Sequence, residues 1–247
     1  MEITQAIAAK VVEVVDAGLV KGVGVAEPGK MCVEAAVCYA MGLPHGDDPA
    51  CVSPALRRLK ICLNDRQWSS NQARAKGLRR LAVAQLGSAG ALDEKEFMRR
   101  VVEMTIRKAV PIALRAAAKL NPKHAEKLEA AAVRCEVEGT REAARAAAAA
   151  AYAAAAAAAY AAAYAAAYAA ADAAAYADAY AAAYAAAYAA ADAAAYAAAA
   201  AAAAADAAAD AAARDRVLAE YAEWVVEILI DMNAPGRQWL TLTPKAA

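Results

Sequence analysis

A short loop at residues 38–51 contains the densest group of side chains in the chain that could bind a metal or act as nucleophiles. The group consists of Cys38, His45, Asp47, Asp48 and Cys51. Specific zinc sites usually pair their ligands as C-x2-C or H-x3-H, whereas this loop has the spacings C-x6-H and H-x5-C. The spacing therefore favours two half-buried thiols beside a polar turn. Cys38, His45 and Cys51 remain weak metal candidates, and we expect no cofactor.

The same loop raises a catalytic hypothesis, in which Cys38 or Cys51 is a nucleophile activated by His45. Nothing in the sequence orients the histidine, so we assign no catalytic residue and expect a protein that is not an enzyme. A second pattern, from Gly24 to Lys30, matches the G-x-x-x-x-G-K core of a phosphate-binding loop. Met31 stands where a Ser or Thr would hold Mg²⁺, and the pattern follows a helix rather than a buried strand. We interpret it as a Gly-Pro turn that leads into a helix.

Basic residues are concentrated between positions 57 and 80, where Asp65 is the only acid. Two helices joined by the turn NDRQW, with Trp68 beside them, could present these residues to phosphate groups. The turn is longer than the three or four residues of a helix-turn-helix. A solvated face paired with acids of other helices is the alternative. The candidate nucleic-acid residues are Arg57, Arg58, Lys60, Arg66, Arg74, Lys76, Arg79 and Arg80.

The elements that position these residues are predicted to be helices, because apolar residues recur at spacings of three and four and no segment alternates with period two. Ser53 before Pro54 and Ser69–Ser70 before Asn71 predict two helix starts. The fold class is therefore all-α. The expected helices span residues 3–15, 30–41, 54–63, 71–86 and 93–120 with a kink near Pro111, and a sixth begins at Pro122; Gly139 is the last glycine or proline before Pro235.

From Ala146 to Ala213 the chain contains only Ala, Tyr and Asp. Alanine has the highest helix propensity, so this tract predicts a very long helix, either one rod or an antiparallel hairpin. From Tyr160 to Tyr196 every fourth residue is a Tyr, except for Asp172 and Asp192, and a step of four residues turns about 40° around the helix axis. The tyrosines thus form an i,i+4 ladder that winds round the helix rather than a seam for one partner. The segments 160–176 and 180–196 are identical, and the 20-residue units that begin with them differ only at Asp178 against Ala198, which also fits a tolerated expansion of the coding DNA.

The tail is predicted to be an amphipathic helix with a strong apolar stripe. We expect three regions: a helical head at 1–140, the arm at 141–213 and the tail at 214–247. A stripe of this kind must be buried, either by docking on the head or by self-association. The stripe consists of Val217, Leu218, Tyr221, Trp224, Val225, Ile228 and Leu229.

Two segments carry a resemblance to other proteins: EPGKMCVEAAVCYAMGLPHGDDPACVSPALRRLKICLND and WSSNQARAKGLRRLAVAQLGS. They resemble uncharacterised bacterial proteins in which alanine-rich AAAY repeats of variable length precede a short C-terminal helix. The resemblance covers roughly residues 20–90 and the tail, and it implies no activity and no site residue. It does imply that the arm is an insertion, so that head and tail pack together.

The chain's composition bears on its location. The N-terminus has an early acid and no uncharged apolar core, and the five cysteines are expected to be reduced thiols. The uncharged run at 146–171 is long enough to cross a bilayer. Alanine, however, contributes little to insertion, and five aspartates follow that run. We therefore expect a cytoplasmic protein without a membrane partner.

Three functions remain after these arguments. The first is a non-enzymatic structural or interaction protein whose arm acts as a spacer or assembles with other copies, which predicts self-association. The alternative is nucleic-acid binding through the Arg57–Arg80 face. A minor alternative is ice or surface binding by the alanine-rich helix, although no flat face of threonines is present. No small-molecule substrate is indicated.

Overall fold

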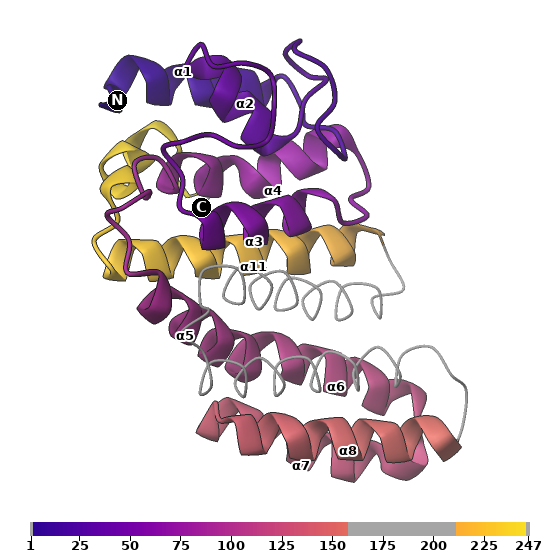
Figure 1. The fold of residues 1–247 in the computed structure, drawn as a ribbon. Coiled ribbons are helices and arrows are strands. Elements are labelled where there is room, and N and C mark those ends of the chain that lie inside the picture. Colours follow the sequence, from indigo (N-terminus) through magenta and orange to yellow (C-terminus); the bar gives the residue numbers. More distant parts are fainter. Residues whose placement is uncertain (1, 158–210, 246–247) are drawn as a thin grey trace. The chain divides into compact units, whose positions relative to one another are not determined.

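The computed structural model describes residues 2–157 and 211–245, and every regular element in them is a helix (Figure 1). The only β-type pairing in those residues is an isolated bridge between Gly24 and Met31. The all-α prediction is confirmed. The α-helices are α1 (Gln5–Asp16), α2 (Val33–Ala40), α3 (Pro54–Asn64), α4 (Asn71–Ala84), α5 (Glu94–Met104), α6 (Val110–Leu120), α7 (Ala125–Glu138), α8 (Arg141–Ala157) and α11 (Ala211–Asp231). Three shorter elements are the π-helix η1 (Thr105–Ala109) and the 3-10 helices η2 (Pro122–His124) and η3 (Pro235–Leu242).

Helix starts lie where the capping residues predict them. The Ser53 side chain accepts a hydrogen bond from the Leu56 N–H at 3.4 Å, and Pro54 occupies the first turn. Ser70 accepts from the Ala73 N–H at 3.0 Å. These hydroxyls satisfy amide donors that have no partner within the helix. The local sequence therefore determines where α3 and α4 begin.

The chain forms two compact units. Unit 1 comprises Met1–Phe97 together with Leu218–Ala247, and unit 2 comprises Met98–Val217. The predicted boundaries near 140 and 213 differ from this division, which falls inside α5 and inside α11. The C-terminal tail thus belongs with the first 97 residues.

Unit 1 is a stack of helices that includes the tail (Figure 1). Helix α1 packs against α2 and α4, and η3 packs against α4 and α1. Tyr221 of α11 is fully buried. If Gly77 of α4 carried a Cβ atom, that atom would lie 3.3 Å from the Cβ of Ala219 in α11. At Gly236, in the first turn of η3, the Ala84 carbonyl oxygen lies only 2.3 Å from the position that a Cβ would take. Small residues therefore permit close contact between the tail and α4.

Unit 2 has a core made largely of alanine. Helices α6, α7 and α8 pack together, and α8 contributes buried methyl groups at helical spacing. Such short side chains let helix axes approach closely. The first 17 residues of the predicted arm, α8, are thus one layer of a packed unit. The buried alanines of α8 are Ala143, Ala144, Ala147, Ala148, Ala151 and Ala154.

The C-terminus of α7 is capped by a side chain from elsewhere in unit 2. The Arg107 guanidinium donates hydrogen bonds to the carbonyl oxygens of Glu136, Val137 and Glu138, at 2.7 to 2.9 Å. Gly139 follows with φ +62°, in the left-handed region that glycine commonly adopts where a helix ends. The cation and the left-handed glycine together satisfy carbonyls that the helix leaves unpaired.

The kink expected near Pro111 corresponds to a π-helical segment, η1, directly before α6. Proline has no N–H to donate to the preceding turn, which weakens the helical ladder there. Thr105 also bonds its hydroxyl to the Val101 carbonyl at 2.7 Å, a contact that often bends helices. The tyrosine ladder and the choice between rod and hairpin concern residues 158–210, which lie outside the described residues.

We predict that Gly77→Ala destabilises unit 1. Alanine in a helix is normally favoured over glycine by about 1 kcal/mol. Here the new methyl group would lie 2.4 Å from Cη2 and 2.5 Å from Cζ3 of Trp68, a buried ring whose Nε1 donates to the Leu63 carbonyl. Overpacking of this kind costs about 1–3 kcal/mol, which outweighs the gain in helix propensity, so we expect a net loss of up to about 2 kcal/mol.

Urea unfolding followed by tryptophan fluorescence measures this loss, because Trp68, Trp224 and Trp239 all belong to unit 1. Gly46→Ala is the matched control, since no atom lies within 4 Å of its Cβ position. Equal unfolding midpoints for the two variants would contradict the packing described for Trp68.

Candidate functional site

The residues of the 38–51 loop have separate partners. His45 Nε2 lies 3.1 Å from the Gly24 carbonyl oxygen, and the Cys51 thiol lies 3.3 Å from the Met41 sulfur. Burial raises the pKa of Cys38 to about 11 and also raises the pKa of Cys51. A raised pKa lowers the thiolate fraction, which is the opposite of nucleophile activation. Within residues 2–157 and 211–245 no group of three metal-binding side chains is found.

The G-x-x-x-x-G-K segment closes on its own backbone. At Gly24, where φ is +72°, the Lys30 carbonyl oxygen lies 2.1 Å from the Cβ position. Val25 N–H donates to that same oxygen at 2.8 Å. The Lys30 ammonium pairs with Glu27 at 3.0 Å, within the turn itself. This geometry is a tight turn before α2 rather than a strand followed by a phosphate-binding loop.

Two of the predicted nucleic-acid residues are buried inside unit 1. Arg74 is 6% exposed, and its guanidinium donates to the carbonyl oxygens of Asn64 at 2.7 Å and Leu19 at 2.9 Å. Lys60 is 0% exposed and pairs with Glu34. Both cations therefore stabilise the interior of the unit, where no phosphate group can reach them.

Three further basic residues pair with acids of other segments. Arg57 contacts Asp47 at 3.0 Å, and Arg79 contacts Asp16 at 2.6 Å. Arg80 pairs with Glu223 of the tail at 3.0 Å. Of the predicted face, Arg58 and Lys76 are exposed and Arg66 is half-buried. Nucleic-acid binding stays a prediction, and it would have to use these remaining side chains.

Arg80 makes polar contacts that connect α4 to the tail. Besides Glu223, its guanidinium donates at 2.5 Å to the carbonyl oxygen of Thr243. The two side chains of the ion pair are only 19% and 17% exposed, so solvent screens them weakly. Lys245 lies 3.6 Å from Glu223 and adds positive charge at the same point. One arginine thus connects α4 to two separate parts of the tail.

The apolar stripe predicted to mediate self-association is packed largely within unit 1. Trp224 is half-buried, with its ring centroid 6.2 Å from that of Tyr221. Val217 instead packs with the core of unit 2. Self-association itself stays a prediction. The stripe residues buried in unit 1 are Leu218, Tyr221, Val225, Ile228 and Leu229.

A fully buried polar cluster joins three helices of unit 1. It consists of Glu34 on α2, Lys60 on α3 and Gln85 at the end of α4, each 0% exposed. The Lys60 ammonium lies 3.2 Å from Glu34 Oε2, and Gln85 Nε2 donates to the same oxygen at 3.3 Å. Pairing compensates part of the cost of removing both charges from water.

Burial controls the protonation of this pair. Desolvation raises the pKa of Glu34 to about 7, although Lys60 opposes the shift. Desolvation also lowers the pKa of Lys60, against the attraction of Glu34. Burial outweighs pairing for both groups, so the Glu34 carboxyl exchanges its proton near neutral pH.

No sequence motif marks this cluster, and the basic run from Arg57 to Arg80 predicts a surface position for Lys60. One signal was available: Glu34 is the only charged residue in the run MCVEAAVCYAM, and its nearest neighbours are apolar. An isolated acid in an apolar helix indicates a buried partner of opposite charge. The identity of that partner depends on tertiary packing.

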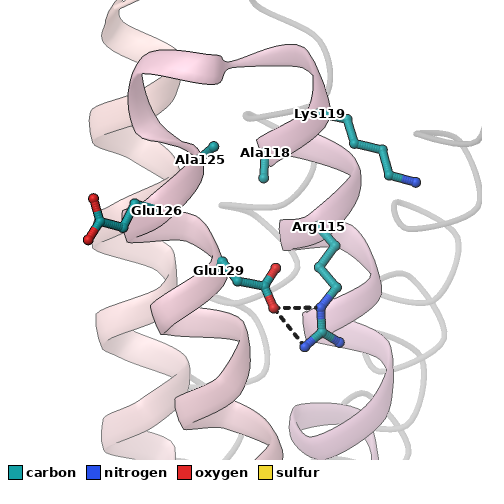
Figure 2. A pocket seen from close by; sticks show the side chains of 6 residues that line it. All are labelled: Arg115, Ala118, Lys119, Ala125, Glu126 and Glu129. Atoms are coloured by element: carbon teal, nitrogen blue, oxygen red, sulfur yellow. Dashed lines mark hydrogen bonds and ion pairs between the residues drawn. The ribbon is translucent and has the colours of Figure 1, made fainter.

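The surface of unit 2 has a hollow of about 500 Å³ between α6 and α7 (Figure 2). Figure 2 shows Arg115 turned toward Glu129, and the two lie 2.9 Å apart. Arg115 also pairs with Glu136, so its charge is compensated. The hollow therefore has no convergent, unpaired polar group. Its lining residues are Arg115, Ala118, Lys119, Ala125, Glu126 and Glu129.

Comparisons with other proteins add no family. The chain matches no known protein-family model, no curated protein and no solved structure. In the part of the chain that the structure describes, no helix combines the length and hydropathy needed to cross a membrane.

We predict that Glu34 makes the stability of unit 1 depend on pH. The pKa of Glu34 is about 7 in the folded state and 4.5 in its ordinary state, so the folded protein binds this proton more tightly. The contribution of the bound proton to the free energy of unfolding is fully present below about pH 4.5 and is lost as the pH rises through 7. Between these two limits the free energy of unfolding changes by about 3 kcal/mol.

The measurement compares the free energy of unfolding of the wild type with that of Glu34→Gln between pH 5 and pH 8. Glutamine resembles the protonated carboxyl, so the wild type should lose stability relative to the variant as the pH rises. Exposed Glu2→Gln is the control and should follow the wild type. Parallel curves for wild type and Glu34→Gln would overturn the assignment.

We predict that Arg80→Met destabilises unit 1 by about 2–4 kcal/mol, because it removes two charged hydrogen bonds and leaves Glu223 partly buried without them. Tryptophan fluorescence during urea unfolding gives the value. Lys10→Met, which removes an exposed i,i+3 ion pair with Glu13, should leave the midpoint nearly unchanged. Similar midpoints for both variants would show that Arg80 does not hold the tail.

Proposed function

We propose that the protein is a non-enzymatic structural or interaction protein, in which unit 1 is a helical base that anchors the alanine-rich arm. The observation that supports this most strongly is the composition of unit 1. It contains the first 97 residues and the last 30, so the chain leaves it in α5 and re-enters it in α11. A base that holds both ends of a long intervening segment is suited to presenting that segment.

The contacts of the tail support the anchoring role. Arg80 bonds both Glu223 and the Thr243 carbonyl, and Gly236 lies against the Ala84 carbonyl without room for a side chain. Five residues of the apolar stripe are buried in the same unit. Charged hydrogen bonds at low exposure and buried apolar area are the two contributions that make such docking stable.

The described start of the arm supports a role in helix packing. Along α8, Ala143, Ala147, Ala151 and Ala154 are each 0% exposed, and they face other helices of unit 2. An alanine surface allows close helix contact without selecting for a particular side-chain shape. The arm sequence is accordingly suited to spacing or assembly by helix packing, whether within one chain or between copies.

The chemistry of the thiols also favours a non-enzymatic role. Burial raises the pKa of Cys32 and Cys51, and raises those of Cys38 and Cys135 to about 11. The hollow between α6 and α7 contains compensated surface charges rather than a nucleophile with a base. These features support binding by packed surfaces more than catalysis.

Light scattering coupled to size exclusion, together with small-angle X-ray scattering on the full chain, tests the proposal. We expect a mass above the 25.3 kDa of one chain, or a radius of gyration well above the ~18 Å of a compact protein of this length. An arm used as a spacer increases the radius of gyration, and an arm used for assembly increases the mass because several chains associate. A compact monomer would contradict both roles.

A further inference from the structure

The buried cluster of Glu34, Lys60 and Gln85 contains polar atoms without a hydrogen-bond partner in the protein. They are Glu34 Oε1, Lys60 Nζ and Gln85 Oε1. Lys60 Nζ does lie 3.2 Å from Glu34 Oε2, and the two groups form an ion pair. The angles at these atoms do not suit a hydrogen bond, so Lys60 Nζ counts among the atoms without a hydrogen-bond partner. Six buried side-chain atoms among the described residues lack a partner, and three of them belong to this one cluster.

The three groups that carry these atoms meet at Glu34 Oε2. Lys60 Nζ and Gln85 Nε2 both approach Glu34 Oε2, at 3.2 and 3.3 Å. Glu34 Oε1 belongs to the same carboxyl as that oxygen, and Gln85 Oε1 belongs to the same amide as that nitrogen. Exchanging the two ends of the Gln85 amide would place oxygen against oxygen, so the orientation with Nε2 toward Glu34 is the favourable one.

The chemistry of the three atoms defines what can bind there. When Glu34 is ionised, Glu34 Oε1 and Gln85 Oε1 are acceptors, whereas the Lys60 ammonium is a donor. An ammonium ion or a metal cation would face the charge of Lys60 and accept no hydrogen bond from it. A chloride ion would face the carboxylate and has no proton to donate. Only a small molecule that both donates twice and accepts once complements all three atoms.

We infer that one internal water molecule binds between α2, α3 and α4, donating to Glu34 Oε1 and Gln85 Oε1 and accepting from Lys60 Nζ. Buried waters typically make about three hydrogen bonds to buried polar groups that would otherwise have no partner, which is the number available here. All three side chains are 0% exposed, so this water exchanges with solvent only when unit 1 opens. It completes the polar junction of the three helices.

Magnetic relaxation dispersion of water ¹⁷O on the full chain tests this inference, because it counts water molecules with long residence times. The triple variant Glu34→Leu/Lys60→Met/Gln85→Met replaces the junction with apolar side chains, an exchange that buried ion pairs often tolerate. We expect the dispersion amplitude to fall by the equivalent of one water relative to the wild type. An unchanged amplitude in a folded triple variant would overturn the inference.

Two further samples keep the test decisive. Gln72→Met makes the same chemical change at an exposed glutamine and should preserve the wild-type amplitude. A crystal structure of the unaltered chain, at a resolution that shows ordered water, gives a reading that needs no variant to fold. It should show one water within hydrogen-bond distance of all three atoms. Protein atoms that satisfy Glu34 Oε1 and Gln85 Oε1 directly would contradict the inference.

Discussion

The docking of the C-terminal tail on α4 is the contact on which the organisation of unit 1 depends. It buries an apolar stripe that the tail helix could not leave in water, and it adds a weakly screened ion pair between Arg80 and Glu223. Because the stripe lies about 120 residues beyond α5, its burial closes a long segment of chain between two fixed ends. The entropy of closing such a segment rises only slowly with its length. The base can therefore accommodate intervening segments of different lengths.

A second constraint lies inside unit 1, where the side chains of Glu34 and Lys60 are both removed from water. Buried ion pairs contribute little net stability relative to apolar residues of the same size, but removing one partner is costly. The cluster therefore selects one arrangement of α2, α3 and α4, because any other packing would separate the charges or the Gln85 amide. It also makes that arrangement sensitive to protonation near neutral pH.

Local sequence patterns predicted the elements better than their contacts. Ser53 and Ser70 identify helix starts because capping involves only neighbouring residues. Charged residues were harder to interpret, since the pattern from Arg57 to Arg80 does not specify which cations are exposed. Arg74, Lys60 and Arg80 find their partners 10, 26 and 143 residues away, which is a property of the tertiary fold.

The same limit applies to the tail and to the unit boundaries. The stripe from Val217 to Leu229 correctly indicated that a surface had to be buried, but the tertiary fold decides where: Val217 packs with the core of unit 2, whereas the stripe residues from Leu218 to Leu229 are buried largely in unit 1. Gly77 of α4 and Gly236 of η3 permit close contacts between α4 and the tail, and neither forms a recognisable sequence motif. The division into compact units falls inside α5 and α11, and a helix that runs through a boundary leaves no change of composition there for the sequence to show.

Hydrogen–deuterium exchange of the full chain tests most directly the claim that the tail is an integral part of the base. Amides deep in a cooperative unit exchange only when that unit opens as a whole. If the account is correct, amides of α11 from Leu218 to Asp231 will show the same opening free energy as those of α4 from Ala75 to Ala84. Fast exchange of the α11 amides, with α4 still protected, would contradict it.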